Sequence, residues 1–455
     1  MKKLLFFTFI LLFPFIVFAD NITDNSTIFI NENNANQKLI DNKENTYITI
    51  NTNEEIKIIS NEDIYSLYII YELSSKPGSI SYDNKTISIG ENGYLHEYID
   101  ISKTFNNPKE LTIKFNEDVK IGEIYILGKG ELPEFVEIWD KPLDNNTDLL
   151  LLSTHSDDEQ LFFLGLMPTY IARGANVQVV YFTNHYDNTK RLHELLHGLY
   201  TVGIRNYPIM GIVPDAYSES LEGAIKNIKK SGLTLDDAIN YQVEMIRRFK
   251  PFVIVGHDEL GEYSHGQHIL NTHTLKIALE KTNDETYHED SFNKYGLWNT
   301  PKTYIHLYKE NQIIMDYDTP LEYFDNKTAY EVSKEGYSKH NSQQWTWFTK
   351  WISGSNNSYT KSTDIKTYSP NEYGLYRSLV GEDIERNDMF ENLTYRKDQI
   401  IEDEENKDNI VKDIINNVED TTNDLLKYKA YIITGLLIIL IIPSIFKRKK
   451  NKVRK

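Results

Sequence analysis

The stretch DLLLLSTHSDDEQLFFLG, from Asp148 to Gly165, decides the fold of the larger part of this chain. It opens with a short, continuous apolar run, Leu149 to Leu152, which is typical of a strand buried on both faces of a parallel sheet. One imidazole and three carboxylates follow the run at once: His155, Asp157, Asp158 and Glu159. Polar residues at the carboxyl end of such a strand lie where open α/β sheets bind their ligands.

Two interpretations of this polar cluster stay open from the stretch alone. A histidine and carboxylates within a few residues form the outline of a site for a zinc-like cation. The alternative is a helix N-terminus with a solvated acidic turn, because Asp and Ser commonly cap helices. The chain has no cysteine, so thiolate metal ligands, disulfides and cysteine nucleophiles are excluded.

The residues after this stretch alternate between strand and helix patterns. Apolar runs predict buried strands at Val177–Thr183 and Phe252–His257, and Lys302–Tyr308 is strand-like. The helical patterns run from the polar cluster to about Ala172, then over Lys190–Thr201 and Leu235–Phe249. Strands that alternate with helices predict βαβ units, so the expected class is α/β with a Rossmann-like parallel sheet.

The run that ends at His257 leads into a second polar cluster, which holds Glu262, Tyr263, His265 and His268. Parallel strands of one sheet present their carboxyl ends at the same edge, so we expect the two clusters to face one another. Together they offer nitrogen and oxygen ligands for a three-ligand zinc site with an open position for water. A spare carboxylate could accept the proton of that water.

The two clusters resemble motifs of the LmbE/PIG-L family of zinc-dependent de-N-acetylases. THSDDE is similar to the family's AHPDDE motif, and EYSHGQH is similar to its EYGHPDH motif. The resemblance covers about residues 148–280 and extends more loosely to Phe390. It implies a zinc ion held by three ligands: His155, Asp158 and His268.

The same resemblance implies roles for three further residues. Asp157 would be the general base that activates water, and Tyr263 would polarise the amide carbonyl. His265 would stabilise the oxyanion or protonate the leaving amine. The chain departs from the family motifs at Ser156, Ser264 and Gly266-Gln267, where the family has Pro, Gly and Pro-Asp. None of these is an implied ligand, so the departures concern loop rigidity and substrate choice and not the metal ligands.

Two weaker resemblances extend the expected site to substrate contacts. KRLHELLHGLYTVGI is similar to an R-x-x-E helix of the family, which implies that Arg191 and Glu194 lie at the substrate pocket. KHNSQQ is similar to an H-x-S-Q element, which makes His340 and Gln343 candidate contacts. Surface or packing roles are the alternative for all four residues.

A competing motif lies on the same predicted helix. His193 to His197 matches H-E-x-x-H, with which zincin proteases hold zinc through two histidines one helical turn apart. Glu219 or Glu222 could serve as a third ligand. This metalloprotease hypothesis leaves both strand-end clusters unexplained and stands as the second alternative.

The residues before the α/β part predict a different fold. From Asn21 to about Pro142, short β-rich runs recur with turn residues between them, which predicts a β-sandwich. The order of the segments and the ending IYILGKGELPEF resemble a galactose-binding-like jelly roll. The sequence identifies no carbohydrate-reading residues, and a packing or spacing domain is the alternative.

Both ends of the chain carry apolar segments. Lys2, Lys3 and the apolar run to Ala19 predict a secretory signal peptide, with an uncleaved anchor as the alternative. The run Ala430–Phe446, followed by the basic KRKKNKVRK, predicts a transmembrane helix with a cytoplasmic tail. The expected location is therefore a single-pass membrane protein with its bulk outside the cytoplasm.

These observations predict a domain order and a function. The expected segments are a signal peptide (1–19), a β-sandwich (20–142), a deacetylase domain (143–395), a charged stalk (396–427), a transmembrane helix (428–447) and a basic tail (448–455). The expected function is zinc-dependent hydrolysis of the N-acetyl group of an N-acetylglucosaminyl glycan or glycolipid outside the cytoplasm. The first alternative is a surface glycan-binding protein whose α/β domain has lost catalysis. The net charge of −18 argues against a nucleic-acid partner.

Overall fold

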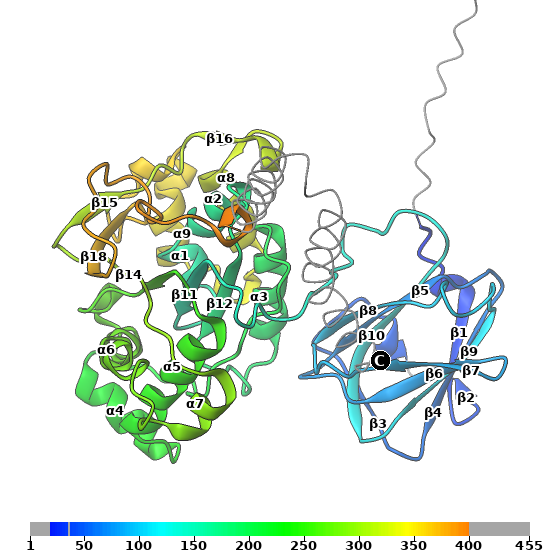
Figure 1. Cartoon of the computed structure of the whole chain (residues 1–455). Coiled ribbons are helices and arrows are strands. Elements are labelled where there is room, and N and C mark those ends of the chain that lie inside the picture. The colour runs from blue at the N-terminus through cyan, green and yellow to red at the C-terminus, as the bar shows by residue number, and fades with distance from the viewer. Residues whose placement is uncertain (1–18, 35–36, 400–455) are drawn as a thin grey trace, which may run out of the picture. The chain divides into compact units, whose positions relative to one another are not determined.

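The computed structural model describes residues 19–34 and 37–399 (Figure 1). The described residues up to Leu393 belong to one compact unit, in which an antiparallel β-sandwich precedes an α/β domain. Residues 1–18 of the expected signal peptide, the expected transmembrane helix and basic tail, and most of the expected stalk lie outside the described residues.

The expected membrane location requires a correction. Within the described ranges, no helix combines the length and the apolar character needed to cross a bilayer. The expectation rested on the linear hydropathy of Ala430–Phe446, which lies outside those ranges. A single-pass location is therefore not carried forward.

The sandwich consists of two antiparallel sheets with the strand orders β2-β1-β4-β9-β6-β7 and β3-β10-β5-β8. In chain order the strands are β1 Ser26–Ile30, β2 Asn33–Asn34, β3 Ile48–Ile50, β4 Glu55–Ser60, β5 Ser66–Tyr71, β6 Gly78–Tyr82, β7 Lys85–Ile89, β8 His96–Asp100, β9 Glu110–Phe115 and β10 Val119–Leu127. Alternate residues of β4, such as Ile56 and Ile58, point into the apolar core between the sheets. This period of two is the pattern from which the sequence predicts strands here.

The α/β domain is built on a sheet with the order β12-β11-β13-β14-β18-β15. Its strands are β11 Leu149–Ser153, β12 Val177–Tyr181, β13 Val253–Gly256, β14 Lys302–His306, β15 Gln312–Ile314 and β18 Glu372–Ser378. The pairs β11–β12, β11–β13 and β13–β14 are parallel, and β18 runs antiparallel to β14 and β15. A short ladder of β16 Pro320–Leu321 and β17 Lys327–Thr328 lies outside this sheet.

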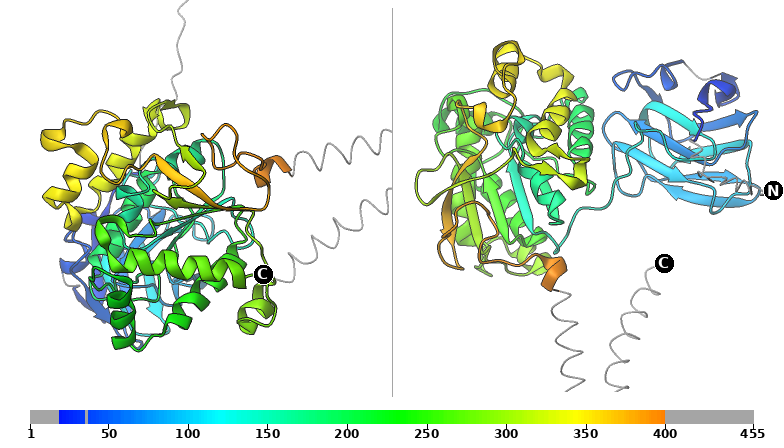
Figure 2. Two further views of the ribbon diagram at one scale, coloured as in Figure 1. Left: turned by 90° about the vertical axis from the view of Figure 1, so that its left-hand side faces the viewer. Right: turned by 90° about the horizontal axis from the view of Figure 1, so that it is seen from above.

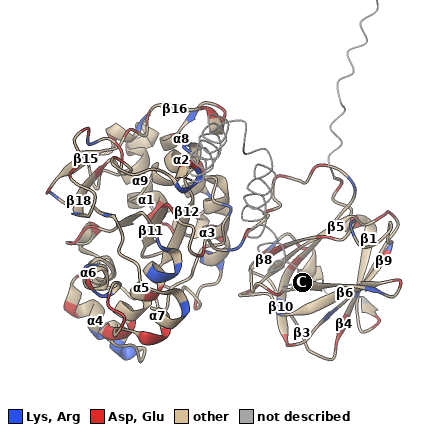
Figure 3. Cartoon of the chain, viewed as in Figure 1, with Lys and Arg blue, Asp and Glu red and all other residues tan. Residues whose placement is uncertain are grey.

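Helices cover both faces of the parallel strands (Figures 1 and 2). They are α1 Asp158–Leu161, α2 Leu166–Ala172, α3 Lys190–Thr201, α4 Leu221–Lys230, α5 Leu235–Phe249, α6 Gly266–Lys281, α7 Glu289–Tyr295, α8 Ala329–Ser338 and α9 Thr346–Ser353. Short 3-10 helices lie in the connections: η1 Thr23–Asn25, η2 Gln37–Leu39, η3 Glu262–Ser264, η4 Glu322–Phe324, η5 Asn341–Gln343, η6 Ser355–Asn357 and η7 Ser362–Asp364. Apolar residues of α4, α5 and α6 pack on Leu150, Leu152 and Ile254 of the sheet. Acidic and basic residues are interspersed along the outer helices (Figure 3).

The strand order reverses between β11 and β13, and open α/β sheets bind their ligands at such a reversal. The chain passes from β11 to β12 on one side of β11 and later returns to β13 on its other side. At such a reversal, the connections after the two central strands diverge to opposite faces and leave a crevice at their carboxyl ends. The two polar clusters of the sequence follow β11 and β13, and the fold therefore brings them to one place.

Two elements differ from the expectation. The helix expected to run unbroken to Ala172 is divided into α1 and α2 at Gly165, whose φ is +87°. A Cβ atom at this position would lie 2.4 Å from Cγ of Tyr317, so the break requires glycine. Residues 361–390 carry no clear strand or helix pattern, yet they contain β18, which pairs with residues about 70 positions earlier in the chain.

Candidate metal centre

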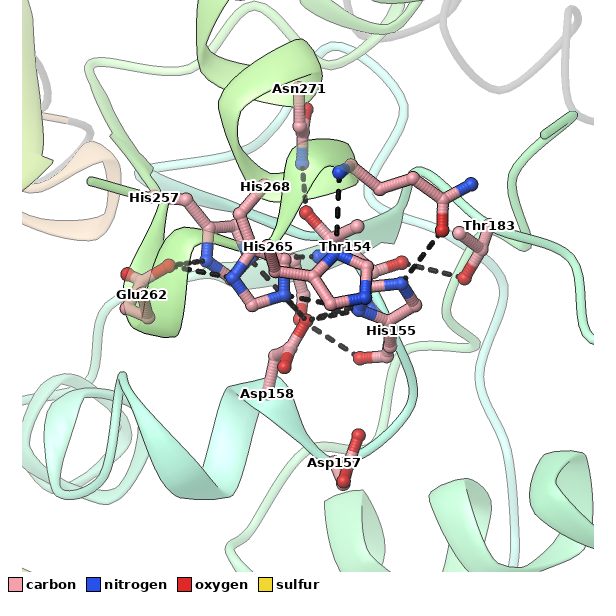
Figure 4. Close-up of polar contacts among 12 residues, drawn as sticks. Thr154, His155, Asp157, Asp158, Thr183, His257, Glu262, His265, His268 and Asn271 are labelled. Atoms are coloured by element: carbon pink, nitrogen blue, oxygen red, sulfur yellow. Dashed lines mark hydrogen bonds and ion pairs between the residues drawn. The ribbon is translucent and has the colours of Figure 1, made fainter. Parts of the chain in front are cut away.

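Three ligand atoms from the two strand ends converge in the crevice (Figure 4). Nδ1 of His155 lies 3.0 Å from Oδ2 of Asp158 and 3.1 Å from Nε2 of His268, and these last two atoms are also 3.1 Å apart. All three side chains are buried. Two ligands of a tetrahedral zinc ion at 2.0–2.1 Å lie about 3.3 Å from each other, so this triangle has nearly the required size.

The orientation of His155 is set by Gln267. Nε2 of His155 donates to Oε1 of Gln267 at 3.0 Å, and the backbone N–H of Ala216 donates to the same oxygen. The amide nitrogen of Gln267 donates in turn to the carbonyl of Pro214, which fixes which end of the amide is the oxygen. Because the outer nitrogen of His155 holds its proton, the inner Nδ1 is the atom free to hold an exchangeable proton or a metal ion.

His268 is oriented in the same way by a buried carboxylate. Its Nδ1 donates to Oε2 of Glu262 at 2.8 Å, which turns Nε2 toward His155 and Asp158. Glu262 also accepts from Nδ1 of His257 at 2.9 Å and from Nδ1 of His306 at 2.6 Å. A carboxylate behind a metal-binding histidine is a recurring arrangement that fixes the ring and raises its basicity.

The charges of this centre are balanced internally. Burial by itself lowers the pKa of His268, but the carboxylates of Asp158 and Glu262 outweigh it and raise that pKa to about 10. Burial also favours a higher pKa for Asp158, yet the imidazoles of His268 and His155 hold it well below its usual value. Imidazole protons therefore compensate the buried carboxylates, and a divalent cation can take the place of those protons.

Glu262 gives a first testable prediction. We expect Glu262→Ala to lower the free energy of unfolding by about 3–5 kcal/mol, because three buried imidazoles lose their shared acceptor. Urea denaturation in the presence of a chelator measures this effect without a contribution from metal binding. The control is Glu259→Ala. The side chain of Glu259 is 42% exposed, so this substitution should lower the free energy of unfolding by less than about 1 kcal/mol. Equal losses in the two variants would contradict the structural role of Glu262.

Two further histidines lie beside the triangle. Ligand atoms of His155, His265 and His268 lie within 4.8 Å of one another, as do those of Asp158, His257 and His268. Nε2 of His257 already accepts the backbone N–H of Thr154 at 2.9 Å, so its lone pair is occupied. His265 caps α6, since its Nδ1 accepts the backbone N–H of Gln267, and its Nε2 is left as the N–H donor.

Asp157 stands apart from the triangle (Figure 4) and is bound to Arg191. Its Oδ1 accepts from Nη2 of Arg191 at 3.0 Å, while Arg191 also donates to the carbonyl of Ser156 and to Asp215. Burial raises the pKa of the Asp157 carboxyl, and the Arg191 guanidinium opposes that shift. The backbone of Asp157 has a φ of +141°, a strained conformation of the kind that clusters at functional sites.

Tyr263 reaches the centre from a similarly strained turn. Tyr263 and Ser264 have φ values of +46° and +60°, in the left-handed region. Ser264 stands where the family motif has glycine, and its backbone conformation gives the physical reason for that glycine. Burial, together with nearby Asp158 and Asp157, raises the pKa of the Tyr263 hydroxyl, which therefore keeps its proton.

The expected substrate contacts are found close to the centre but are engaged with protein groups. Glu194 accepts from the backbone N–H of Ser342 at 2.8 Å, and Nε2 of Gln343 donates to the Ser342 hydroxyl at 3.0 Å. Nε2 of His340 lies 2.8 Å from Oε1 of Glu159, and both side chains are fully buried. Arg191 is held by Asp157 and Asp215, and each of the four residues therefore contacts protein groups in this structure.

The H-E-x-x-H motif does not form a zincin site. In a zincin helix the glutamate acts at the ion held by the two histidines. Here Glu194 accepts from Ser342, whereas His193 contacts His96 of the sandwich and His197 contacts Glu137. The metalloprotease hypothesis therefore lacks its geometric basis.

Sequence reasoning missed four residues that complete the site: Gln267, His257, Asp215 and His185. Gln267 is a departure from the family motif and orients His155, while His257 ends the predicted strand before the second cluster. The backbone N–H of Ser156 donates to Nε2 of His185 at 3.0 Å. A proline, which the family has at this position, could not make that bond. Asp215 and His185 come from connections whose spatial position no local pattern reveals.

A row of aromatic side chains leads from the centre to the surface. Ring centroids are 5.3 Å apart for Tyr263 and Trp351, 5.1 Å for Trp351 and Phe348, and 5.7 Å for Phe348 and Trp347. Trp347 stacks on Trp345 at 5.4 Å, and these two side chains are 54% and 50% exposed. Exposed, stacked aromatic rings beside a polar crevice are typical of a ligand-binding surface.

Residues 150–279 match the family model described as PIG-L, GlcNAc-PI de-N-acetylase. The chain contains a PIG-L family domain. The match includes β11, β13 and both polar clusters, so the three convergent ligand atoms all belong to the PIG-L domain. The sequence resemblance to this family is confirmed.

Curated relatives match the same region. A 1D-myo-inositol 2-acetamido-2-deoxy-alpha-D-glucopyranoside deacetylase from Geodermatophilus obscurus is 27% identical over 179 residues, which are 34% of this chain and 60% of that relative. Its counterpart from Catenulispora acidiphila is 25% identical over 178 residues, with 34% of this chain and 54% of that relative covered. The chain thus spans between half and about three fifths of the length of these relatives.

Solved structures show similarity as well. The N,N'-diacetylchitobiose deacetylase from Pyrococcus horikoshii, solved with an inhibitor, is 13% identical, with 51% of this chain and 85% of that chain covered and a TM-score of 0.36. 

Proposed function

We propose that the PIG-L domain is a zinc-dependent N-deacetylase that hydrolyses the acetamide of an N-acetylglucosaminyl glycan or glycolipid. One observation carries the proposal. Nδ1 of His155, Oδ2 of Asp158 and Nε2 of His268 converge within 3.0–3.1 Å, and Gln267 and Glu262 turn both imidazoles inward. Two histidines, one carboxylate and an open position are the ligand set of catalytic zinc sites.

Zinc at these three ligands would supply Lewis-acid activation of a water molecule at neutral pH. Asp157 is the proposed base that accepts the proton of that water. Arg191 holds the Asp157 carboxylate in place through the 3.0 Å bond, and Arg191 is itself fixed by Asp215 at 2.8 Å. A base positioned in this way contributes about 10²–10⁴-fold to a hydrolysis rate.

His265 and Tyr263 are the proposed partners of the substrate. Burial and the neighbouring imidazoles lower the pKa of His265, so the ring is neutral and offers its Nε2–H. The Tyr263 hydroxyl keeps its proton and is a second donor. Donors aimed at the carbonyl oxygen stabilise the negative charge that develops there when water attacks the amide.

The sugar part of the proposal has two supports. The relatives are named as deacetylases of a 2-acetamido-2-deoxyglucopyranoside, and the family model is described as a GlcNAc-PI de-N-acetylase. The exposed rings of Trp345 and Trp347 lie at the outer end of the aromatic row that starts at Tyr263. Flat apolar faces of this kind suit the apolar face of a sugar ring.

The test is acetate release by the zinc-loaded protein from a panel of substrates. The panel holds N-acetylglucosamine, N,N'-diacetylchitobiose, an N-acetylglucosaminyl inositol and an N-acetylglucosaminyl phosphatidylinositol. We expect release from at least one member, with loss of activity in chelator and recovery on addition of zinc. Binding of these sugars without acetate release by the zinc-loaded protein would favour the non-catalytic glycan-binding alternative instead.

A further inference from the structure

A second cluster of imidazoles and carboxylates lies where α3 meets the sandwich. It consists of two histidines of α3, one histidine of β8 and two glutamates from connecting segments: His193, His197, His96, Glu44 and Glu137. His193 and His197 are one helical turn apart and therefore share a face of α3. Two other residues of α3 have different partners: Arg191 donates to Asp157, and Glu194 accepts from Ser342.

Glu137 holds the two outermost rings of the cluster. Its Oε1 accepts from Nδ1 of His197 at 2.6 Å, and its Oε2 accepts from Nδ1 of His96 at 2.9 Å. Both imidazoles therefore donate from Nδ1, which leaves Nε2 of each as the atom able to bind a metal ion. Glu137 therefore orients the rings of His96 and His197 as Glu262 orients the ring of His268.

The Nε2 atoms already face other ligand groups. Nε2 of His197 lies 2.8 Å from Oε1 of Glu44. Nε2 of His96 lies 2.8 Å from Nδ1 of His193, so one proton is shared between these two nitrogens. Ligand atoms of Glu44, His96 and His197 all lie within 4.8 Å of one another. Metal binding at these atoms would release protons from the cluster, as is usual for histidine sites.

The cluster also has the charge and the access that a cation needs. Two carboxylates, Glu44 and Glu137, stand among three imidazoles, and a divalent cation would compensate both negative charges. His96 and Glu137 are buried, whereas the side chains of Glu44 and His197 are 30% and 26% exposed. The latter two line a surface hollow of about 890 Å³, which gives an ion a path to the cluster.

We propose that Glu44, His96 and His197 form a second zinc site, which joins the sandwich to α3. It is separate from the centre of His155, Asp158 and His268, here called the PIG-L centre. Histidine and glutamate are zinc ligands, and the chain offers no thiolate to compete with them. The role of the site is structural: an ion bound there holds the sandwich to the α/β domain, because its ligands come from two segments of the sandwich and from one helix of the α/β domain. The site also gives a role to His197 of the H-E-x-x-H motif without requiring one for Glu194.

The experiment counts zinc per chain in the full-length protein by mass spectrometry of the metal after dialysis against zinc-containing and then zinc-free buffer. We expect two equivalents in the wild type and one in Glu44→Gln and in His197→Gln, with acetate release retained in both variants. The control is Glu134→Gln, which lies in the same hollow and should keep two equivalents. Glu44→Gln changes a side chain that is 30% exposed, so it tests the proposal even if His197→Gln fails to fold.

The possible counts separate this proposal from the function proposed above. If the wild type binds one equivalent of zinc and both variants keep it, the second site is overturned and the PIG-L centre remains supported. If the wild type binds one equivalent and both variants lose it, the second site is supported and zinc binding at the PIG-L centre is contradicted. Two equivalents that persist in both variants would overturn the proposal.

Discussion

Replacing Asp157 with asparagine is expected to lower kcat/KM for acetate release by about 10²–10⁴-fold while zinc binding is retained. Asparagine has the shape of aspartate and can still accept from Arg191, so the local geometry is kept. What it lacks is the basic oxygen that takes the proton of the attacking water. Acetate release and zinc per chain, measured on the same preparation, check both parts of the expectation.

The matched control for this substitution is Asp187→Asn. Asp187 is exposed and lies in the connection before α3. We expect it to leave activity and zinc content unchanged. An Asp157→Asn variant with wild-type activity would show that another group accepts the proton, and a variant that loses zinc would place Asp157 among the ligands.

Replacing His268 with alanine is expected to remove one equivalent of zinc per chain and to abolish detectable acetate release. The substitution deletes one corner of the triangle, and the two remaining atoms, on His155 and Asp158, cannot hold zinc with comparable affinity. It also leaves Glu262 with one imidazole donor fewer. Metal analysis and an acetate assay with added zinc measure the two effects.

His273→Ala is the control for the loss at His268, because it removes a partly exposed imidazole from the same helix, α6. We expect its zinc content and activity to equal those of the wild type. If His268→Ala keeps the full zinc content of the wild type, His268 is not a zinc ligand and the proposed centre is contradicted.

Local patterns predicted much of the α/β domain. The structure places α3 at Lys190–Thr201 and α5 at Leu235–Phe249, which are the predicted bounds. Both ends of α5 could be predicted, because Thr234 and Asp237 form a capping box at its start and Pro251 follows its last turn. Signals of this kind act within one helical turn and need no knowledge of the rest of the chain.

Patterns failed where distant contacts decide the local structure. β18 forms because β14 and β15 offer it free edges, and its own residues carry no decisive periodicity. α1 and α2 are separated at Gly165 because Tyr317, far along the chain, packs against that glycine. Neither contact can be inferred from neighbouring residues, since the partners are brought together only by the completed sheet.

The candidate site divides in the same way. The sequence by itself determined the parallel sheet and the two polar clusters, because buried strands need continuous apolar runs and a cluster after a strand must lie at its carboxyl end. Only the tertiary structure decided which atoms meet. Hydrogen bonds to Gln267 and Glu262 orient the rings of His155 and His268. On α3, His193 and His197 contact the sandwich side and not the polar clusters. The physical reason is that a hydrogen bond fixes a ring within a few ångströms, and a distance of this kind between segments as far apart in the sequence as those of His155 and Gln267 exists only after folding.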